Sequence, residues 1–344
     1  MLTLHVDAAA WRAHMKSTAA EYPALVPVAK GNGYGFGNAR LATEAAQLGA
    51  DTIAVGTLTE VADVTRVGDF SSILVLTPWY PGEPSDIATP PAVVRTVASL
   101  DGLEGLRGAR VVLECLTSLR RHGIAYTDLG EIARLVDRVR IEGWAMHLPI
   151  DRFPGTDPVR EVAQWVDTLQ AGALPLATVY VSHLTAAEIA RLSSRFPKVT
   201  FRARVGTQLW LGDRSFFEAR GTVLDVMRMA KGDRYGYRQR EAPSDGHLLV
   251  VSGGTSHGIG MEAPKAVIGA VRRAKVVAAA GLASMNRNLS PFTWQGKQRW
   301  FAEPPHMQVS LLWLPTDVPP PVPGDELPAD VRMTTTHFDR IQLA

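Results

Sequence analysis

Cysteine is almost missing from this chain of 344 residues, which contains Cys115 alone. A single cysteine excludes a disulfide within the chain and fits a reducing compartment. The chain also lacks a run of about 18 apolar residues, the length that a membrane-spanning helix needs. Its first residues, 1–7, contain no apolar segment typical of a signal peptide. These absences predict a cytoplasmic protein without a membrane partner.

A strong excess of charge of either sign is missing as well. Lysine and arginine number 36 and aspartate and glutamate 34, which gives a formal net charge of +2. This balance is too even to indicate binding to nucleic acid or to an anionic membrane surface. The hydrophobic content of 46% and the chain length instead predict a globular protein with one large and one smaller domain.

The most informative stretch covers residues 25–37, where an apolar run ends in Lys30 and continues into a glycine-rich loop around Tyr34. A P-loop is excluded because its lysine follows the glycines, whereas Lys30 precedes them. Two interpretations remain. Lys30 is either a solvated residue at the end of an edge strand, or a Schiff-base lysine beside a loop whose backbone N–H groups and Tyr34 hydroxyl hold a phosphate.

Apolar strands and helical periods alternate over the first two thirds of the chain, which predicts a parallel α/β fold, best fitted by a (β/α)8 TIM barrel over residues 7–222. We expect a short first strand at 1–6, and then a helix over 8–20 capped by Asp7. The expected barrel strands are 25–29, 52–56, 72–76, 110–114, 142–147, 177–182 and 200–204, with an eighth near 93–97. The expected helices between them include 38–49, 58–66, 127–139 and 158–171.

Short strand patterns separated by glycine, proline and charge replace the helical periods after residue 222. We therefore expect a C-terminal mostly β domain built from residues 223–344 together with 1–6. The predicted strands are 223–229, 234–237, 248–251, 266–277, 299–302 and 307–314. The proline-rich stretch 317–328 is predicted to be a turn region.

The stretch around Lys30 resembles the signature Val-Val-Lys-Ala-Asn-Ala-Tyr-Gly-His-Gly of alanine racemases, fold-type III enzymes that use pyridoxal 5'-phosphate (PLP). The sequence departs from it at Gly31, Gly33 and Phe36. Residues 231–237, Lys-Gly-Asp-Arg-Tyr-Gly-Tyr, resemble that family's Lys-Gly-Asp-x-Val-Gly-Tyr, so the resemblance spans nearly the whole chain. It implies that Lys30 carries PLP and that Tyr34 contacts the cofactor's phosphate.

Further motifs carry the resemblance to other parts of the cofactor site. Residues 204–207, Arg-Val-Gly-Thr, resemble the family's Arg-Pro-Gly-Ile. This implies that Arg204 faces the pyridine nitrogen and that Gly206 and Thr207 offer backbone N–H groups to the phosphate. His147, at the end of a predicted strand, stands where the family has a histidine stacked on the cofactor ring. The alternative for Arg204 is an ion pair with a carboxylate, and the alternative for His147 is a hydrogen bond within the barrel.

Residues 181–187 resemble the family's Ala-Asn-Ser-Ala-Ala and imply a phosphate contact from Thr185, with Ser182 as the competing candidate. Thr185 as the cap of the following helix is the other interpretation. Residues 111–123 are similar to a family segment that places Arg121 on the substrate carboxylate. Glu114 occupies the position of a lysine that many members carbamylate. Its carboxylate is expected to face Arg121, unless Arg121 is ordinary surface charge.

The largest departure lies at residues 251–260, where the family has Gly-Tyr-x-Asp-Gly and the tyrosine is the second acid–base group, supplied across a dimer interface. Thr255 falls on the tyrosine and His257 on the aspartate. A threonine hydroxyl is too weak an acid for this role, so His257 is the candidate, with a turn histidine as the alternative. Met307 is implied to lie near substrate bound to the partner subunit, and Phe338 replaces a phosphate-binding tyrosine.

The resemblance therefore implies a homodimeric, PLP-dependent isomerase that interconverts L- and D-alanine or a similar small amino acid, without a metal ion. Two alternatives stay open because the family's tyrosine is missing. One is a PLP enzyme with one-sided chemistry at Cα or another substrate, and the other is a racemase-like protein that binds PLP or a partner without catalysis.

Overall fold

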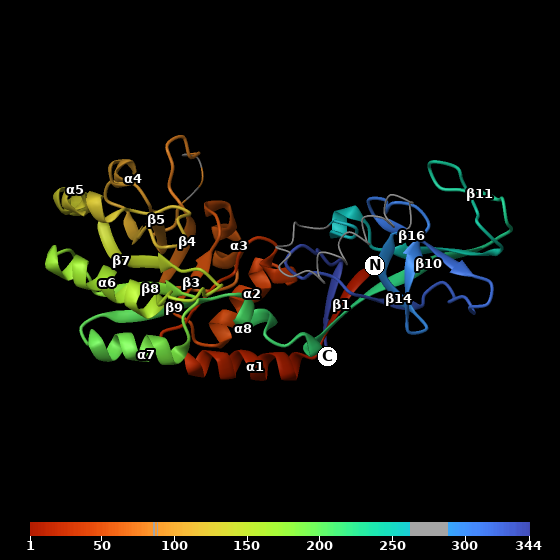
Figure 1. Ribbon diagram of the computed structural model, residues 1–344, viewed down its shortest axis with the longest axis horizontal. Helices are drawn as coiled ribbons and strands as arrows, with labels where there is room; N and C mark the ends of the chain where they lie inside the picture. The colour runs from red at the N-terminus through yellow and green to blue at the C-terminus, as the bar shows by residue number, and fades with distance from the viewer. Residues whose placement is uncertain (85–86, 88, 262–287) are drawn as a thin grey trace. The chain divides into compact units, whose positions relative to one another are not determined.

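The computed structural model describes residues 1–84, 87, 89–261 and 288–344 (Figure 1). The chain divides into two compact units, residues 12–212 and residues 1–11 with 213–344. The sequence places the boundaries at 6/7 and 222/223. These predicted boundaries differ from those of the structure, because the first turn of helix α1 (Ala8–Glu21) and the start of strand β10 (Phe217–Met229) belong to the second unit.

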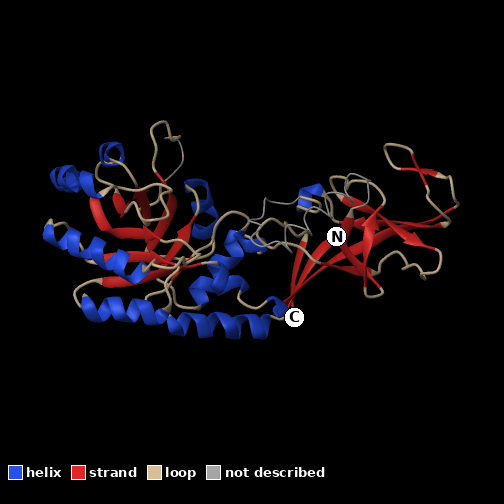
Figure 2. Cartoon of the chain, in the orientation of Figure 1, coloured by secondary structure: helices blue, strands red, loops and turns tan. Residues whose placement is uncertain are grey.

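The first unit is the predicted barrel of eight parallel strands, surrounded by helices (Figure 2). The strands around it are β2 (Val26–Pro27), β9 (Thr200–Val205), β8 (Thr178–Ser182), β7 (Arg140–His147), β6 (Arg110–Glu114), β5 (Val93–Val97), β4 (Ser72–Pro78) and β3 (Thr52–Val55). A bridge between Val28 and Ala54 joins β2 to β3 and closes the ring. The strand expected near 93–97 is therefore confirmed as β5.

The barrel encloses a core made by one face of each strand, as the alternation of side chains in a strand requires. This core contains Val26, Val28, Ala54, Leu74, Val94, Val112, Ala145 and Tyr180. The opposite faces of the strands pack against the helices outside. These helices are α2 (Asn38–Gln47), α3 (Val61–Thr65), α4 (Leu100–Gly105), α5 (Leu129–Leu135), α6 (Pro158–Ala171), α7 (Ala186–Arg195) and α8 (Thr207–Leu211).

Local sequence explains where the helices begin. Asp7 caps α1 by accepting a hydrogen bond from the N–H of Ala10 at 2.9 Å, as predicted. Asp157 caps α6 in the same way, with Pro158 at the first helical position and bonds from the N–H groups of Val159 and Arg160 at 3.0 and 3.1 Å. These caps fix the loops that enter the helices, and the loops that follow the barrel strands carry the candidate site.

The second unit is built mainly of strands, as predicted. Its large sheet has the order β13-β16-β15-β14-β17-β10-β1-β18, and β13 also pairs with β10. Its strands are β1 (Leu2–Val6), β10, β13 (Gly246–Ser252), β14 (Leu289–Trp294), β15 (Lys297–Phe301), β16 (Val309–Pro315), β17 (Glu326–Ala329) and β18 (Arg340–Leu343), with a separate hairpin of β11 (Arg234–Tyr235) and β12 (Arg240–Glu241).

Besides β12, the partner of β11 in the hairpin, three further strands of this unit were not predicted. Strands β14 and β17 contain Pro291 and Pro328, which argue against a strand in a sequence, and β17 begins within the expected turn region. The third, β18, is short and pairs in parallel with β1. The expected strand 266–277 lies outside the described residues. No helix in the described ranges has the length and apolar character needed to cross a membrane.

Candidate active site

Lys30 follows strand β2 at the end of the barrel where the strands finish. The Trp210 indole fixes the approach to it by donating a hydrogen bond to the carbonyl of Val28 at 2.8 Å. Partial burial lowers the pKa of the Lys30 ammonium, and the positive charges of Arg121 and Arg204 lower it further. Glu60 acts in the opposite direction. The shift raises the fraction of neutral amine, which is the nucleophilic form of a lysine.

Tyr34 lies in the loop after Lys30 with a left-handed backbone, φ 54°, which turns its side chain back into the barrel. The ring is buried, and its hydroxyl makes a hydrogen bond with the side chain of Thr207. Burial raises the pKa of Tyr34 to about 12, so the phenol keeps its proton at neutral pH. Tyr34 therefore presents a hydroxyl donor beside the start of helix α8.

Gly206 provides the space for that hydroxyl. A Cβ added to Gly206 would lie 2.1 Å from the Tyr34 Oη and 2.9 Å from its Cζ, far inside van der Waals contact. The glycine is therefore required by the close approach of the ring, and together with Thr207 it leads into α8. The structure thus brings three predicted phosphate-site residues, Tyr34, Gly206 and Thr207, into one cluster.

We expect Gly206→Ala to lower the free energy of unfolding by about 1–3 kcal/mol, because the added methyl group forces Tyr34 out of its place. Gly130→Ala is the matched control, since Gly130 lies in α5 with no atom within 4 Å of an added Cβ. There the change should be neutral or stabilise by up to about 1 kcal/mol. Urea unfolding of both variants measures the difference, and equal stabilities would contradict the prediction.

Arg204 and Glu114 form a buried ion pair inside the barrel mouth. Their side chains are about 5% and 4% exposed, and Arg204 Nη1 lies 3.4 Å from Glu114 Oε2. The other two guanidinium nitrogens of Arg204, Nε and Nη2, are buried with no hydrogen-bond partner among the described residues. Buried donors are almost always paired in folded proteins, so these two N–H groups are suited to an acceptor from a ligand.

The expected pairing of Glu114 with Arg121 is wrong. Glu114 lies in strand β6 and instead pairs with Arg204 of strand β9. This contact links the two strands inside the barrel. Arg121 is exposed and donates from Nε to His122 Nε2 at 3.0 Å. The physical reason is the strand itself, which buries Glu114, whereas Arg121 follows in a solvent-accessible loop. The guanidinium of Arg121 still lies close enough to lower the pKa of Lys30.

His147 ends strand β7, and its Nδ1 lies 2.6 Å from the hydroxyl of Ser182 at the end of β8. Burial lowers the pKa of His147 from 6.5 to about 3, with further contributions from Arg204, Arg121, His183 and Lys30. The ring is therefore neutral at physiological pH. Ser182, Arg204 and Lys30 all act on this ring, so the ends of strands β2, β7, β8 and β9 meet around one space.

This shift has a consequence for stability. Folded His147 stays neutral down to about pH 3, whereas the unfolded residue takes up a proton near pH 6.5. The unfolded chain then binds more protons, so the stability present above pH 6.5 is lost as the pH falls towards 3. We expect the slope of unfolding free energy against pH in this window to exceed that of His147→Gln by up to about one proton. Urea titrations across the window measure it, and parallel slopes would refute the shift.

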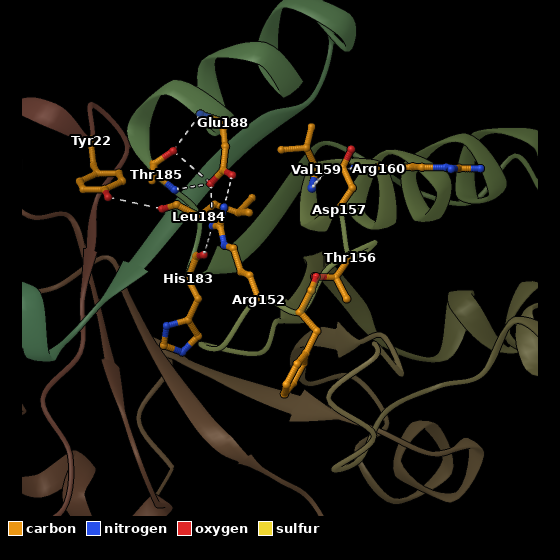
Figure 3. Close-up of polar contacts among 11 residues, drawn as sticks. Tyr22, Arg152, Thr156, Asp157, Val159, Arg160, His183, Leu184, Thr185 and Glu188 are labelled. Carbon is orange, nitrogen blue, oxygen red and sulfur yellow. Dashed lines mark hydrogen bonds and ion pairs between the residues drawn. The ribbon is translucent and has the colours of Figure 1, made fainter. Parts of the chain in front are cut away.

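Thr185 lies outside this cluster of charges and caps helix α7 (Figure 3). Its hydroxyl accepts a hydrogen bond from the N–H of Glu188 at 3.3 Å and donates to Glu188 Oε2 at 3.0 Å. Arg152 pairs with the same carboxylate, and this pairing is the largest of the causes that lower the pKa of Glu188 to about 2. The capping interpretation of Thr185 thus accounts for its hydroxyl, and its phosphate role stays a prediction.

A pocket of about 440 Å³ lies beside this cap. Polar groups from four separate segments line it, together with the first residues of α7 and Ile150. The polar residues are Glu21, Tyr22, Arg152, His183, Thr185 and Gln208. Tyr22 donates a hydrogen bond across it to the carbonyl of Leu184 at 3.4 Å.

His257 lies in the second unit and is buried there. Its Nδ1 accepts a hydrogen bond from the N–H of Gly254 at 3.1 Å, and its Nε2 lies 3.0 Å from Asp339 Oδ1. An acceptor at Nδ1 places the ring proton on Nε2, which donates to the aspartate. Both nitrogens are therefore engaged within the unit, as the turn-histidine interpretation requires. Met307, by contrast, is exposed. The catalytic role of His257 and the substrate contact of Met307 stay predictions.

His183 also lies close enough to Lys30 for the lysine's charge to lower its pKa, and this histidine was not predicted. The signal was available, because His183 directly follows an apolar strand, as His147 does. Parallel strands of a barrel end at one face, so polar residues at those ends gather there. No group of three or more histidine, cysteine, aspartate or glutamate side chains arranged for a metal ion occurs in the part of the chain that the structure describes.

Comparison with known proteins identifies relatives of both the sequence and the fold. The family described as "Alanine racemase, N-terminal domain" matches residues 6–211. An alanine racemase of Symbiobacterium thermophilum is 34% identical over 171 residues, a match that covers 45% of this chain and 44% of that protein. The chain thus matches less than half the length of this curated relative.

Two solved structures share the fold over nearly the whole chain. The alanine racemase from Bartonella henselae with covalently bound pyridoxal phosphate has a TM-score of 0.70 at 16% identity, covering 99% of both chains. The alanine racemase from D-cycloserine-producing Streptomyces lavendulae has a TM-score of 0.68 at 19% identity, covering 99% of this chain and 96% of the other. Both likenesses confirm the barrel with a C-terminal β domain.

Proposed function

This chain belongs to the alanine racemase family, and from that premise we propose that it is a PLP-dependent isomerase that racemises a small amino acid through Lys30. The observation that carries the proposal combines two residues at one barrel mouth. Lys30 has a lowered pKa, and the buried Arg204 has two guanidinium nitrogens without a hydrogen-bond partner among the described residues. The first supplies an amine for the cofactor aldehyde, and the second a donor for a ring nitrogen.

The residues present fit PLP at each of its polar ends. Arg204 has unpartnered buried donors for the pyridine nitrogen, and Lys30 lies close enough to be influenced by it. Tyr34 offers a protonated hydroxyl near the start of α8, in the space that Gly206 leaves open, for the phosphate. His147, neutral at physiological pH, presents an uncharged ring to the cofactor.

When bound, PLP withdraws electrons from the substrate Cα and so makes its proton easier to remove. The chain's own residues do the remaining work. Lys30 Nζ holds the cofactor and exchanges a proton with Cα on one face. Arg204, paired with Glu114, would donate a hydrogen bond to the ring nitrogen of the bound cofactor. Arg121, exposed at the mouth, binds the substrate carboxylate.

The proposal includes a cytoplasmic homodimer with L- and D-alanine as substrates. Met307 is exposed on its unit, which suits a contact with substrate held by a second copy of the chain. Thr185 remains the proposed additional phosphate contact. No role for nucleic acid or a membrane is part of the proposal.

The test is a PLP titration followed by a chiral assay on the same sample. We expect added PLP to produce the visible absorbance of a lysine-bound cofactor. We expect the loaded protein to convert the L-form of alanine, or of another small amino acid, into its D-form. A protein that acquires no visible band would contradict PLP binding. A loaded protein that inverts none of a panel of small amino acids would contradict racemisation.

A second function has one specific observation in its favour. Thr255 replaces the family's tyrosine, and both ring nitrogens of His257 are engaged. If no other group serves the opposite face of Cα, the enzyme performs one-sided chemistry. Reaction in D₂O distinguishes the two functions, because deuterium enters Cα with inversion in a racemase and without inversion in a one-sided enzyme.

A further inference from the structure

His183 occupies an unusual place at the end of strand β8. Its backbone is left-handed, with φ 62°, which is uncommon for a residue other than glycine. Side chains in a strand normally alternate between faces. The left-handed turn breaks that alternation, so that Ser182 contacts the His147 ring and His183 lies edge-on to the same ring, with 5.1 Å between the centroids. Such backbone strain is concentrated at functional sites.

A polar network holds this turn in place (Figure 3). Arg152 donates from Nη2 to the His183 carbonyl at 3.1 Å and to Glu188 Oε2 at 2.9 Å. Glu188 in turn accepts from the Thr185 N–H at 2.8 Å in the cap of α7. The backbone of His183 is thus fixed from one side, while Figure 3 shows its ring extending away from Arg152. The network orients the ring without contacting it.

The ring of His183 is available for chemistry. It is exposed, and neither of its nitrogens makes a hydrogen bond with any described residue. Partial burial, and then the charges of Arg204 and Lys30, lower its pKa, so the ring is largely neutral at pH 7 and can accept a proton. In the barrel order β2-β9-β8, Arg204 lies on the strand between those that Lys30 and His183 follow. The two bases therefore flank the residue proposed to hold the cofactor ring.

We propose that His183 is the acid–base group that serves the face of Cα opposite Lys30, so that both proton-transfer groups come from one barrel. This rests on the proposed racemase function. In one direction Lys30 Nζ takes the Cα proton and a protonated His183 returns one to the other face. The C–H bond that breaks is replaced by one that forms, and the substrate's net proton count is unchanged. In the reverse direction the two groups exchange roles, and each resets its protonation with solvent.

The first test separates inversion from exchange in the PLP-loaded protein. His183→Asn is the chosen variant, because asparagine tolerates a left-handed backbone but cannot exchange protons at neutral pH. In D₂O we expect racemisation to fall by about 10²- to 10⁴-fold, while deuterium exchange continues for the one enantiomer whose proton faces Lys30. The cofactor absorbance should be unchanged. His247→Gln, at a histidine of the other unit, should behave as wild type.

Two outcomes would overturn the proposal. Racemisation by His183→Asn at the wild-type rate would show that another group serves this face. Equal loss of exchange for both enantiomers would show that the residue only positions Lys30 or the cofactor. His183→Gly with added imidazole gives a second variant, and restored racemisation is expected if the ring itself transfers the proton. Absence of the cofactor band in wild-type protein would instead refute the proposed function on which this inference rests.

A second test needs no turnover. Diethyl pyrocarbonate acylates neutral, accessible imidazoles, and peptide mass spectrometry locates the modified residue. We expect His183 to be modified in protein without PLP and protected once the visible band has formed. His257 is buried with both nitrogens engaged, so it should remain unmodified throughout as the internal control. Equal modification of His183 with and without bound cofactor would place the ring away from the reacting face and overturn the proposal.

Discussion

We expect Lys30→Ala to abolish the visible band of the lysine-bound cofactor and to lower racemisation by at least about 10⁴-fold. A positioned acid–base group alone contributes about 10²- to 10⁴-fold, and Lys30 is proposed to hold the cofactor as well. The structure supports so large an effect because partial burial, and then the charges of Arg121 and Arg204, lower the pKa of Lys30. Absorbance spectra and the chiral assay measure both losses.

Two control variants separate the chemistry of Lys30 from its charge. Lys30→Arg retains a cation but has no amine that can lose its proton near neutral pH, so it should fail as completely as alanine. Lys198→Ala removes an exposed lysine after helix α7 and should leave both readouts unchanged. A visible band of normal intensity in Lys30→Ala would mean that another lysine carries the cofactor.

Arg204→Met should destabilise the protein by about 3–5 kcal/mol, because it leaves the Glu114 carboxylate buried without its partner. Met retains much of the apolar stem of arginine, so the loss reports mainly the unpaired charge. Urea unfolding at pH 7 measures it. The same variant should bind PLP more weakly, since the donors to the pyridine nitrogen are gone.

The double variant Arg204→Met with Glu114→Leu tests this explanation. Replacing both members of a buried ion pair by apolar residues is often neutral or stabilising. We therefore expect stability to return towards wild type while the weaker PLP binding persists. If the double variant is as unstable as Arg204→Met alone, the ion pair is not the cause of the loss.

The barrel could be predicted from the sequence because most of its strands are buried and contain short apolar runs that alternate with helical periods. The strand Val93–Val97 lies close to the weak signal expected there. The second unit was harder, because β14 and β17 contain proline and depend on pairing with distant strands. Periodicity within a short segment does not record such pairing.

The candidate site also contains residues that the sequence could predict and residues that it could not. Lys30, Tyr34 and Arg204 could be singled out as candidates because each lies in a motif at or after a predicted barrel strand, and their cofactor roles stay predictions. The partner of Glu114 could not, since residues 90 positions apart in the sequence meet only through the closed barrel. His183 was missed because its left-handed backbone, which turns its ring towards His147, leaves no mark in a period-two pattern.

Strand β1 has one further consequence, which concerns the order in which the chain can assemble during synthesis. Residues 2–6 pair with β10 on one side and with β18, residues 340–343, on the other. Leu2, Leu4 and Val6 are almost fully buried in that arrangement. Strand β1 is synthesised before both of its neighbours, since β10 and β18 follow the whole barrel in the sequence. The barrel forms a compact unit of residues 12–212, so we expect it to fold before β1 can pair in its sheet.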